Sequence, residues 1–251
     1  MLFALAALGL VGHSQSRLHT RTYDLDEQIA HVLAFVDAAP AAPLCLVGHS
    51  IGAHIALRVL AARPTRVASV VGLYPFLQNN AQSPVQRVLT LAVRLRPLVW
   101  LVALLAEGLS RLPAGVRRAL LRPVLRHVGG LGDGAVDVSC DWLRAASVLN
   151  TCDLGASEFA ALAAPPDWAA LRAHASRVSL FFGPPGDIWA PPQHAREVQQ
   201  QAPAVAVATD GTYGHMFCVT PAGARHVAQA TAAMLRTMAT AAPSDTPAEV
   251  A

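Results

Sequence analysis

The chain has 251 residues, enough for one sizeable domain with a single core, and no shift in composition divides it in two. At 53% hydrophobic and 14% charged residues it is more apolar than most soluble enzymes, which suggests that part of its surface meets lipid or another partner. Its net charge is +3, and it carries no recognisable nucleic-acid-binding motif, so we expect no nucleic acid partner. Its four cysteines are far apart, no His, Asp and Glu cluster has zinc spacing, and no glycine-rich loop resembles a nucleotide site. The sequence therefore predicts reduced cysteines, no metal and no cofactor.

Strand and helix patterns alternate over the first part of the chain. An apolar run at Leu5–Val11 is typical of a strand or a helix end. Helical spacing follows over residues 25–36, and then come two apolar strands, Leu44–Val47 and Val67–Leu73, with a helix pattern between them. Cys45 falls inside the first of these strands, where a buried thiol is expected. This alternation predicts a mostly parallel sheet with right-handed crossovers and helices on both faces.

The strand pattern disappears between Leu77 and about Arg172, where apolar helical stretches are interrupted by prolines. So long a stretch without a strand indicates an insertion rather than a loop. Strands resume at Val178–Phe182 and 205–208, and a last helix is expected from Pro221 to Met238. We expect one α/β core made of residues 1–79 and 173–238, with residues 80–172 inserted as a helical cap. Residues 239–251 are expected to be a disordered tail.

The motif Gly48-His-Ser-Ile-Gly52 is a G-x-S-x-G pattern with an apolar strand before it and a helix after it. That context is typical of the nucleophile elbow of an α/β-hydrolase. A sharp turn exposes the hydroxyl of Ser50 in a strained conformation, and we expect side chains at the flanking glycines to collide with neighbouring backbone. The N–H of Ile51, in the first turn of the helix, is the expected oxyanion donor.

A serine hydroxyl needs a positioned base, and the base needs an anion that holds its tautomer. In this fold the chain order is Ser, acid, His. Asp187 lies in a turn-rich loop after the strand Val178–Phe182, and His215 lies in the loop after the next strand. The sequence therefore predicts Ser50, Asp187 and His215 as a catalytic triad, with Asp210 as the nearest rival acid.

The remaining histidines and two tryptophans are secondary candidates. His49 is expected to pack beside the nucleophile rather than act as the base, because neighbouring strand residues point to opposite faces. We expect His49, Trp100 and Trp189 to line the substrate site. His13 and His54 fit structural positions better than catalytic ones.

The inserted segment combines apolar and basic residues. Between Asn80 and Val128 one acid, Glu107, stands against eight arginines: Arg87, Arg94, Arg96, Arg111, Arg117, Arg118, Arg122 and Arg126. The apolar run Leu98–Ala106 is too short to span a bilayer, which takes about 20 residues. Basic flanks and Trp100 instead favour a segment that lies in a lipid interface or beneath a cap. The alternative is that the leucines pack on the sheet and the arginines are solvated.

Several segments together resemble the lipid droplet-associated hydrolases. The resemblance rests on residues 47–53, on Gly72-Leu-Tyr-Pro-Phe-Leu77 followed by Gln82-Ser-Pro84, and on the loops at 182–191 and 214–217, and it covers nearly all of residues 10–235. It implies a serine α/β-hydrolase that cleaves a hydrophobic carboxylic (lipid) ester at the surface of the lipid droplet or the endoplasmic reticulum, on the cytosolic face. Residues 80–128 would make the lipid contact.

One departure from this pattern concerns the second oxyanion donor, which in this fold comes from a glycine-rich loop after an earlier strand. No such turn lies upstream of Ser50, so we expect the N-terminal strands and the donor loop to be missing, as in a truncated form. Loss of one donor costs about 10²–10³ in rate. The alternatives are therefore a catalytically impaired lipid-droplet surface protein and an acyltransferase that uses the same triad.

Overall fold

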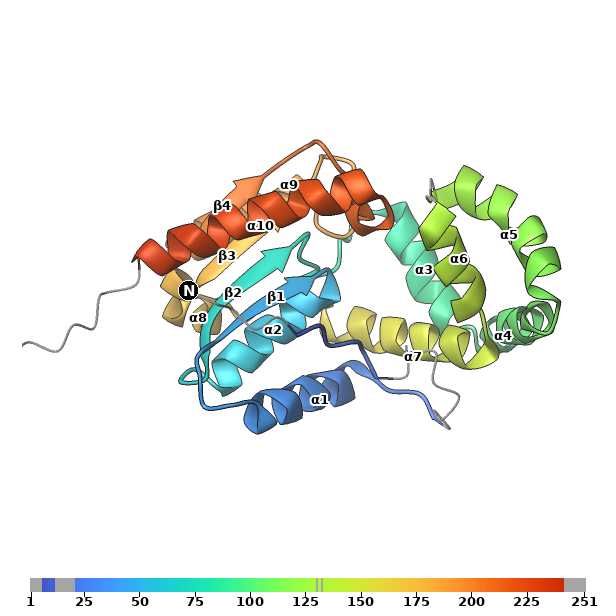
Figure 1. Ribbon diagram of the computed structural model, residues 1–251. Coiled ribbons are helices and arrows are strands. Elements are labelled where there is room, and N and C mark those ends of the chain that lie inside the picture. The colour runs from blue at the N-terminus through green and yellow to red at the C-terminus, as the bar shows by residue number, and fades with distance from the viewer. Residues whose placement is uncertain (1–5, 12–20, 130, 132, 242–251) are drawn as a thin grey trace, which may run out of the picture.

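Four parallel strands form the centre of the computed structural model, which describes residues 6–11, 21–129, 131 and 133–241 (Figure 1). The strands lie side by side in chain order, and each neighbouring pair is parallel. Their bounds are β1 (Leu44–His49), β2 (Val67–Leu73), β3 (Val178–Phe182) and β4 (Ala206–Thr209). The prediction of a parallel sheet is confirmed, and β2 and β3 have the predicted bounds.

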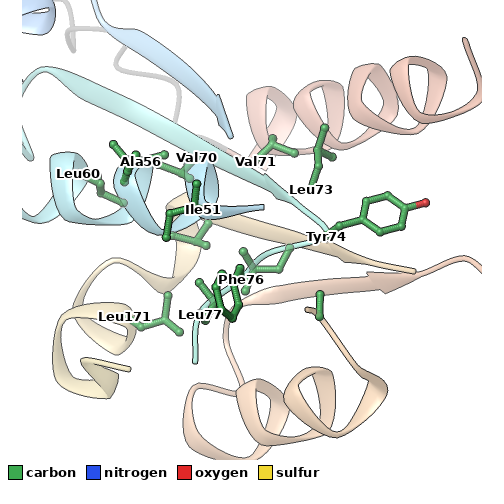
Figure 2. Close-up of a cluster of buried hydrophobic side chains, with 14 of the residues drawn as sticks. Ile51, Ala56, Leu60, Val70, Val71, Leu73, Tyr74, Phe76, Leu77 and Leu171 are labelled. Carbon is green, nitrogen blue, oxygen red and sulfur yellow. The ribbon is translucent and has the colours of Figure 1, made fainter. Parts of the chain in front are cut away.

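Helices cover both faces of this sheet. On one face α2 (Ile51–Ala62) contacts β1 and β2, and α1 (Leu25–Ala38) packs against α2. On the other face α10 (Pro221–Ala241) crosses the strands (Figure 1). The helices α8 (Trp168–Ala173) and α9 (Pro192–Gln201) flank β3 and β4 in the chain. Their apolar side chains join those of the strands in one buried core, part of which is drawn in Figure 2.

The position of the first helix is defined by its own sequence. Asp24 accepts a hydrogen bond from the backbone N–H of Glu27, and the Glu27 carboxylate accepts one from the backbone N–H of Asp24. This reciprocal pair satisfies two N–H groups that the helix leaves free. The buried amide of Gln28 then bonds both the N–H and the carbonyl of Val11, which anchors the N-terminal segment to α1.

Five of the six α-helices described between β2 and β3 form a helical lobe beside the sheet (Figure 1). They are α3 (Pro84–Arg94), α4 (Arg96–Ser110), α5 (Ala114–Gly129), α6 (Asp133–Trp142) and α7 (Ala145–Ala161). Pro84 and Pro97 stand in first turns, where a missing N–H costs little, whereas Pro123 lies inside α5. The lobe occupies the segment predicted to be an insertion, and α7 packs against both α3 and α4.

Three expectations fail in the described part of the chain. Residues 6–11 form neither strand nor helix, although Leu5–Val11 was expected to do so. Cys45 is exposed rather than buried, because β1 is the edge strand and that face of it lines a cavity of about 330 Å³ beside residues 6–10. The last helix runs to Ala241, past the predicted start of the tail at residue 239. The remaining tail residues 242–251 lie outside the described residues, as do His13 and the predicted loop over residues 12–16.

Candidate active site

The turn between β1 and α2 holds Ser50 in an unusual backbone conformation. Its φ is 56° and its ψ is −122°, in a region that residues with a side chain rarely adopt. The turn is kept in place by the N–H of Ser50, which donates to the carbonyl of Leu73 at 2.9 Å, and by the carbonyl of Ser50, which accepts from the N–H of Phe76 at 3.2 Å. Strand β2 therefore supports the strained turn from the side.

The two glycines of the motif differ in how much room surrounds them. A Cβ built on Gly48 would lie 2.2 Å from the carbonyl oxygen of Gly52, so no side chain fits there. A Cβ built on Gly52 has no described atom within 4 Å outside its own helix backbone and chain neighbours. The expected collision is confirmed at Gly48, and the described residues give no steric reason for Gly52.

The three residues predicted as a triad meet at the carboxyl ends of the strands. Nε2 of His215 lies 2.9 Å from Oγ of Ser50, across 165 residues of sequence. Nδ1 of the same ring lies 2.9 Å from Oδ2 and 3.1 Å from Oδ1 of Asp187. A carboxylate only accepts, so Nδ1 carries the proton, and Nε2 is left to accept a hydrogen bond from the serine hydroxyl.

The Asp187 carboxylate is buried and fully bonded. Its Oδ1 accepts from the backbone N–H groups of Trp189 at 2.8 Å and Ala190 at 3.0 Å, in addition to the His215 ring. Burial alone would raise the pKa of Asp187, but the hydrogen bonds from His215 and these two amides outweigh it and hold the pKa below its ordinary value. The carboxylate is therefore charged and able to hold the imidazole in one tautomer.

The rival acid, Asp210, is engaged elsewhere. Its carboxylate accepts from the N–H of Thr212 at 2.7 Å and lies 2.5 Å from Nε2 of His226 on α10. Hydrogen bonds from Thr212 and His226 lower the pKa of Asp210 to about 2. Asp210 thus ties the loop that carries His215 to the last helix, and the described contacts of His215 are with Asp187 instead.

His49 and His54 are both half-buried and uncharged. Burial lowers the pKa of each to about 4. The ring of His49 lies 4.9 Å from the ring of His215, and its Nε2 lies 3.0 Å from the backbone oxygen of His215. His54 lies one turn into α2, and no contact with the predicted triad is described for it. His49 is therefore part of the site, whereas His54 is not brought to it.

The two tryptophans end up in different places. The ring of Trp189 lies 6.3 Å from that of His215 and stacks on Phe159 of α7, with the ring centroids 6.0 Å apart. Phe76, which follows β2, closes the same aromatic group from its other side. Trp100 is half exposed on α4, a helix that lies on the side of the lobe away from the sheet in Figure 1, and no ring contact between Trp100 and these residues is described. The structure joins Trp189, and not Trp100, to the predicted triad.

Sequence reasoning assigned no role to Phe159, Phe217 or Tyr74. Tyr74 has a positive φ of 47°, its hydroxyl donates to the carbonyl of Tyr213 at 2.8 Å, and its ring stacks on that of Phe217. The Tyr-Pro passage after β2 is a sequence signal for a special turn at Tyr74. Nothing in the sequence indicates that Phe159, deep in a helical segment, would reach Trp189.

Metal binding has no support in the part of the chain that the structure describes. No group of three or more His, Cys, Asp or Glu side chains there lies close enough together to hold an ion. The acid and histidine pairs that do form, Asp187 with His215 and Asp210 with His226, are each two-membered.

The parallel sheet, its helices and the order of the three side chains are those of an α/β-hydrolase, which confirms the predicted fold class. This chain belongs to the lipid-droplet associated hydrolase family, whose model matches residues 2–218. It is similar to the lipid droplet-associated hydrolase of Gallus gallus, with 26% identity over 185 residues, which is 72% of this chain and 56% of that protein. The chain thus spans little more than half the length of this relative.

Two solved structures illustrate the fold. An esterase from Thermogutta terrifontis has a TM-score of 0.56 and 14% identity, over 91% of this chain and 78% of that one. The haloalkane dehalogenase DatA from Agrobacterium tumefaciens has a TM-score of 0.59 and 15% identity, over 88% of this chain and 77% of that one. Because an esterase and a dehalogenase share this architecture, the fold does not identify the reaction, and the residues of the site must be used instead.

Proposed function

We propose that this protein is a serine-dependent hydrolase of a hydrophobic carboxylic ester. The observation that carries the proposal is the pair of contacts of His215, 2.9 Å to Ser50 Oγ and 2.9 Å to Asp187 Oδ2. In the first step the hydroxyl of Ser50 attacks the ester carbonyl carbon while Nε2 of His215 takes its proton. Asp187 stabilises the imidazolium that results, and that proton then passes to the departing alcohol. Water, activated by the same ring, hydrolyses the acyl-enzyme and releases the acid.

The developing oxyanion needs donors, and α2 supplies one candidate. Its first residue, Ile51, directly follows Ser50, and the N–H groups of a first helical turn have no partner within the helix. They also carry the positive end of the helix dipole. We assign the N–H of Ile51 as an oxyanion donor on this basis.

The apolar character of the substrate is inferred from the aromatic group beside His215. Trp189, Phe76 and Phe159 pack edge to face or stacked, with centroids 5.2–6.2 Å apart, and Trp189 keeps part of its surface exposed. Such a wall favours a hydrocarbon chain over a charged group. Because Phe159 belongs to α7, the helical lobe would contribute to the wall and act as a cap.

The lipid surface is the proposed location, and the apolar outer face of α3–α5 is the proposed contact. Large apolar side chains are exposed along these helices: Val85, Val88, Leu91, Leu95, Leu98, Trp100, Leu101, Val102, Leu104, Leu105, Val116, Leu120 and Val124. No single described helix is long and apolar enough to cross a bilayer; α3 and α4 together have the length and hydropathy, but they meet at a bend of 83°. A face of this kind suits a helix pair lying on a lipid droplet or on the cytosolic side of the endoplasmic reticulum.

Charge contributes less to this surface than the sequence alone suggests. Six of the eight arginines form ion pairs, five of them with acids of the helical lobe that lie beyond residue 128. Arg118 lies 3.0 Å from Asp137, and Arg122 and Arg126 share Asp133. Five acids thus offset part of the charge of the eight arginines, so we propose that apolar insertion, more than attraction to anionic lipid, makes the contact.

The decisive experiment is covalent labelling by a fluorophosphonate probe, which reacts with activated serines. Wild type should be labelled, Ser50→Ala should not be, and Ser110→Ala, which removes a hydroxyl bonded to Glu107 on α4, should be labelled as wild type is. An unlabelled wild type would remove the enzyme proposal and leave the impaired surface protein. With a labelled protein, the ratio of free acid to transferred ester in the presence of an alcohol separates a hydrolase from an acyltransferase.

A further inference from the structure

The loop that carries His215 is tied at its start to α10 by Asp210 and His226, and in its second half the N–H of Phe217 donates to the carbonyl of Gly214 at 3.0 Å. It runs from Asp210 to Phe217 and contains Gly211 and Gly214, and glycine has the widest conformational freedom of any residue. A Cβ built on Gly214 would meet no described atom within 4 Å. Yet the His215 ring must stay within hydrogen-bond reach of Ser50 and Asp187 at once. Whatever fixes this loop from outside therefore decides whether the base is in place.

One outside contact comes from His49, the residue before Ser50. Its Nε2 lies 3.0 Å from the backbone oxygen of His215. Because a carbonyl oxygen only accepts, Nε2 of His49 must carry the hydrogen and donate it. The ring is held edge-on by Phe217 and Tyr74, with centroids 4.9 and 6.2 Å away. Burial keeps His49 neutral at ordinary pH, with its pKa lowered to about 4, so it adds no positive charge beside the base.

A second contact comes from Tyr74, just after β2. Its hydroxyl donates to the carbonyl of Tyr213 at 2.8 Å, and burial raises its pKa to about 12, which keeps the proton on the oxygen. Figure 2 shows this hydroxyl at the end of the aliphatic cluster and pointing away from it. The ring is fully buried, and Gly183 packs so closely against it that a Cβ on Gly183 would lie 2.3 Å from it. The two carbonyls that accept these hydrogen bonds belong to Tyr213 and His215, the residues on either side of Gly214.

We propose that His49 is a positioning residue which, together with Tyr74, holds the loop at the carbonyls flanking Gly214 and so sets His215 between Asp187 and Ser50. Sequence reasoning placed His49 at the substrate; here its ring acts on the base through the backbone. The strand end that presents the nucleophile thus also fixes the base, because His49 is the last residue of β1 and Ser50 follows it directly. This inference rests on the proposed function of the three side chains.

Two substitutions at His49 separate hydrogen bonding from packing. His49→Gln keeps an N–H donor at a similar reach, whereas His49→Leu keeps apolar bulk and loses the donor. We expect His49→Leu to lower kcat for p-nitrophenyl butyrate by about tenfold to a hundredfold, since a misplacement of about 1 Å costs that much, with KM nearly unchanged. His49→Gln should recover most of the loss. A role in packing alone predicts the opposite order, and Leu at least as active as Gln would overturn the proposal.

Tyr74→Phe supplies an independent arm, because it removes one hydroxyl and leaves the ring in place. Its fluorophosphonate labelling rate should fall several-fold, and the same rate should fall further in the double variant with His49→Gln than in His49→Gln alone. If His49→Leu fails to fold, as judged by its melting temperature, the labelling rates of Tyr74→Phe and His49→Gln are compared with that of wild type instead. A labelled wild type with a Tyr74→Phe variant of equal rate overturns the inference alone, whereas an unlabelled wild type overturns the proposed function and the inference with it.

Discussion

The side chain of Asp187 has no exposed surface, whereas that of His215, with Nδ1 2.9 Å from its carboxylate, keeps 12% of its surface exposed. The imidazole is therefore the only partner in the pair that solvent or substrate reaches. A charged carboxylate enclosed in this way fixes the orientation of the imidazole ring. The carboxylate is itself fixed, because it also accepts hydrogen bonds from the backbone N–H groups of Trp189 and Ala190.

Asp187→Asn should lower kcat by about 10³–10⁴ while leaving the fold intact, because an amide in this place favours the wrong tautomer of His215. Steady-state hydrolysis of p-nitrophenyl butyrate measures the effect. Asp210→Asn is the matched control, since its carboxylate pairs with His226 and Thr212. It should lower kcat by less than about tenfold. Equal losses for the two variants would contradict the assignment of the acid.

Gly48→Ala should prevent the turn at Ser50 from forming. Its methyl group would lie 2.2 Å from the carbonyl oxygen of Gly52. A Cβ and a backbone oxygen have no rotatable side-chain bond, so the clash can be relieved only if the backbone shifts. We expect insoluble protein or a loss of more than about 3 kcal/mol in the free energy of unfolding. Gly52→Ala is the control, because its methyl group meets no described atom and alanine suits a helix. Denaturant unfolding of the two variants should therefore diverge.

Stability should pass through a maximum near pH 6.5. The pKa values of His49, His54 and His194 are lowered from 6.5 to about 4 by burial, so the unfolded chain binds more protons between these limits, and stability is lost as the pH falls from 6.5 towards 4. Burial raises the pKa of Glu158 from 4.5 to about 8, so its contribution is lost as the pH rises from 4.5 to 8. Each group contributes a slope of at most about 1.4 kcal/mol per pH unit.

Chemical denaturation between pH 4.5 and 8.5 tests this balance. Below pH 6.5 the three histidines change the free energy of unfolding more than Glu158 does, so stability rises with pH. Above pH 6.5 only Glu158 among these four groups still changes it, so stability falls and the maximum lies near pH 6.5. Glu158→Gln should remove the decline on the alkaline side and leave the acid side in place. A decline that persists unchanged in this variant would show that another group causes it.

Binding to neutral lipid should depend on the leucines of α4 and hardly on salt. Leu104 and Leu105 are 64% and 60% exposed, and replacing both by Gln should weaken binding to phosphatidylcholine-coated triolein droplets by about tenfold or more. Val138→Gln, on α6 and 62% exposed, is the matched control. Flotation in about 50 and about 500 mM NaCl should give similar bound fractions, because six of the eight arginines between residues 80 and 128 are already in ion pairs. Strong release by salt would contradict an apolar contact.

Trp189→Ala should lower kcat/KM for p-nitrophenyl octanoate by about tenfold or more, and much less for the acetate, since only the longer chain reaches the aromatic wall. Trp100→Ala is the control, because that ring is half exposed on α4 and away from the predicted triad. With soluble monomeric esters it should behave as wild type. A uniform loss over both esters in Trp189→Ala would indicate damage to the Asp187 loop instead.

Much of this protein is determined by short stretches of its own sequence. The strands Val67–Leu73 and Val178–Phe182 are predicted by mostly apolar runs with one serine in each, and the strained turn at Ser50 by glycines in a strand-to-helix context. Such features depend on backbone preferences and side-chain periodicity within a few residues, which the sequence displays directly. The chain order of serine, acid and histidine then predicted which side chains would meet.

The tertiary structure alone decided the pairings that no motif indicates. It paired Asp210 with His226, it placed acids of α6 beside the arginines of α5, and it exposed Cys45 by leaving β1 at the sheet edge. It also turned the ring of His49 to a backbone carbonyl 166 residues away. Hydrogen bonds and ion pairs act over a few ångströms, so they depend on which segments the folded chain brings together, and spacing along the sequence carries no record of that distance.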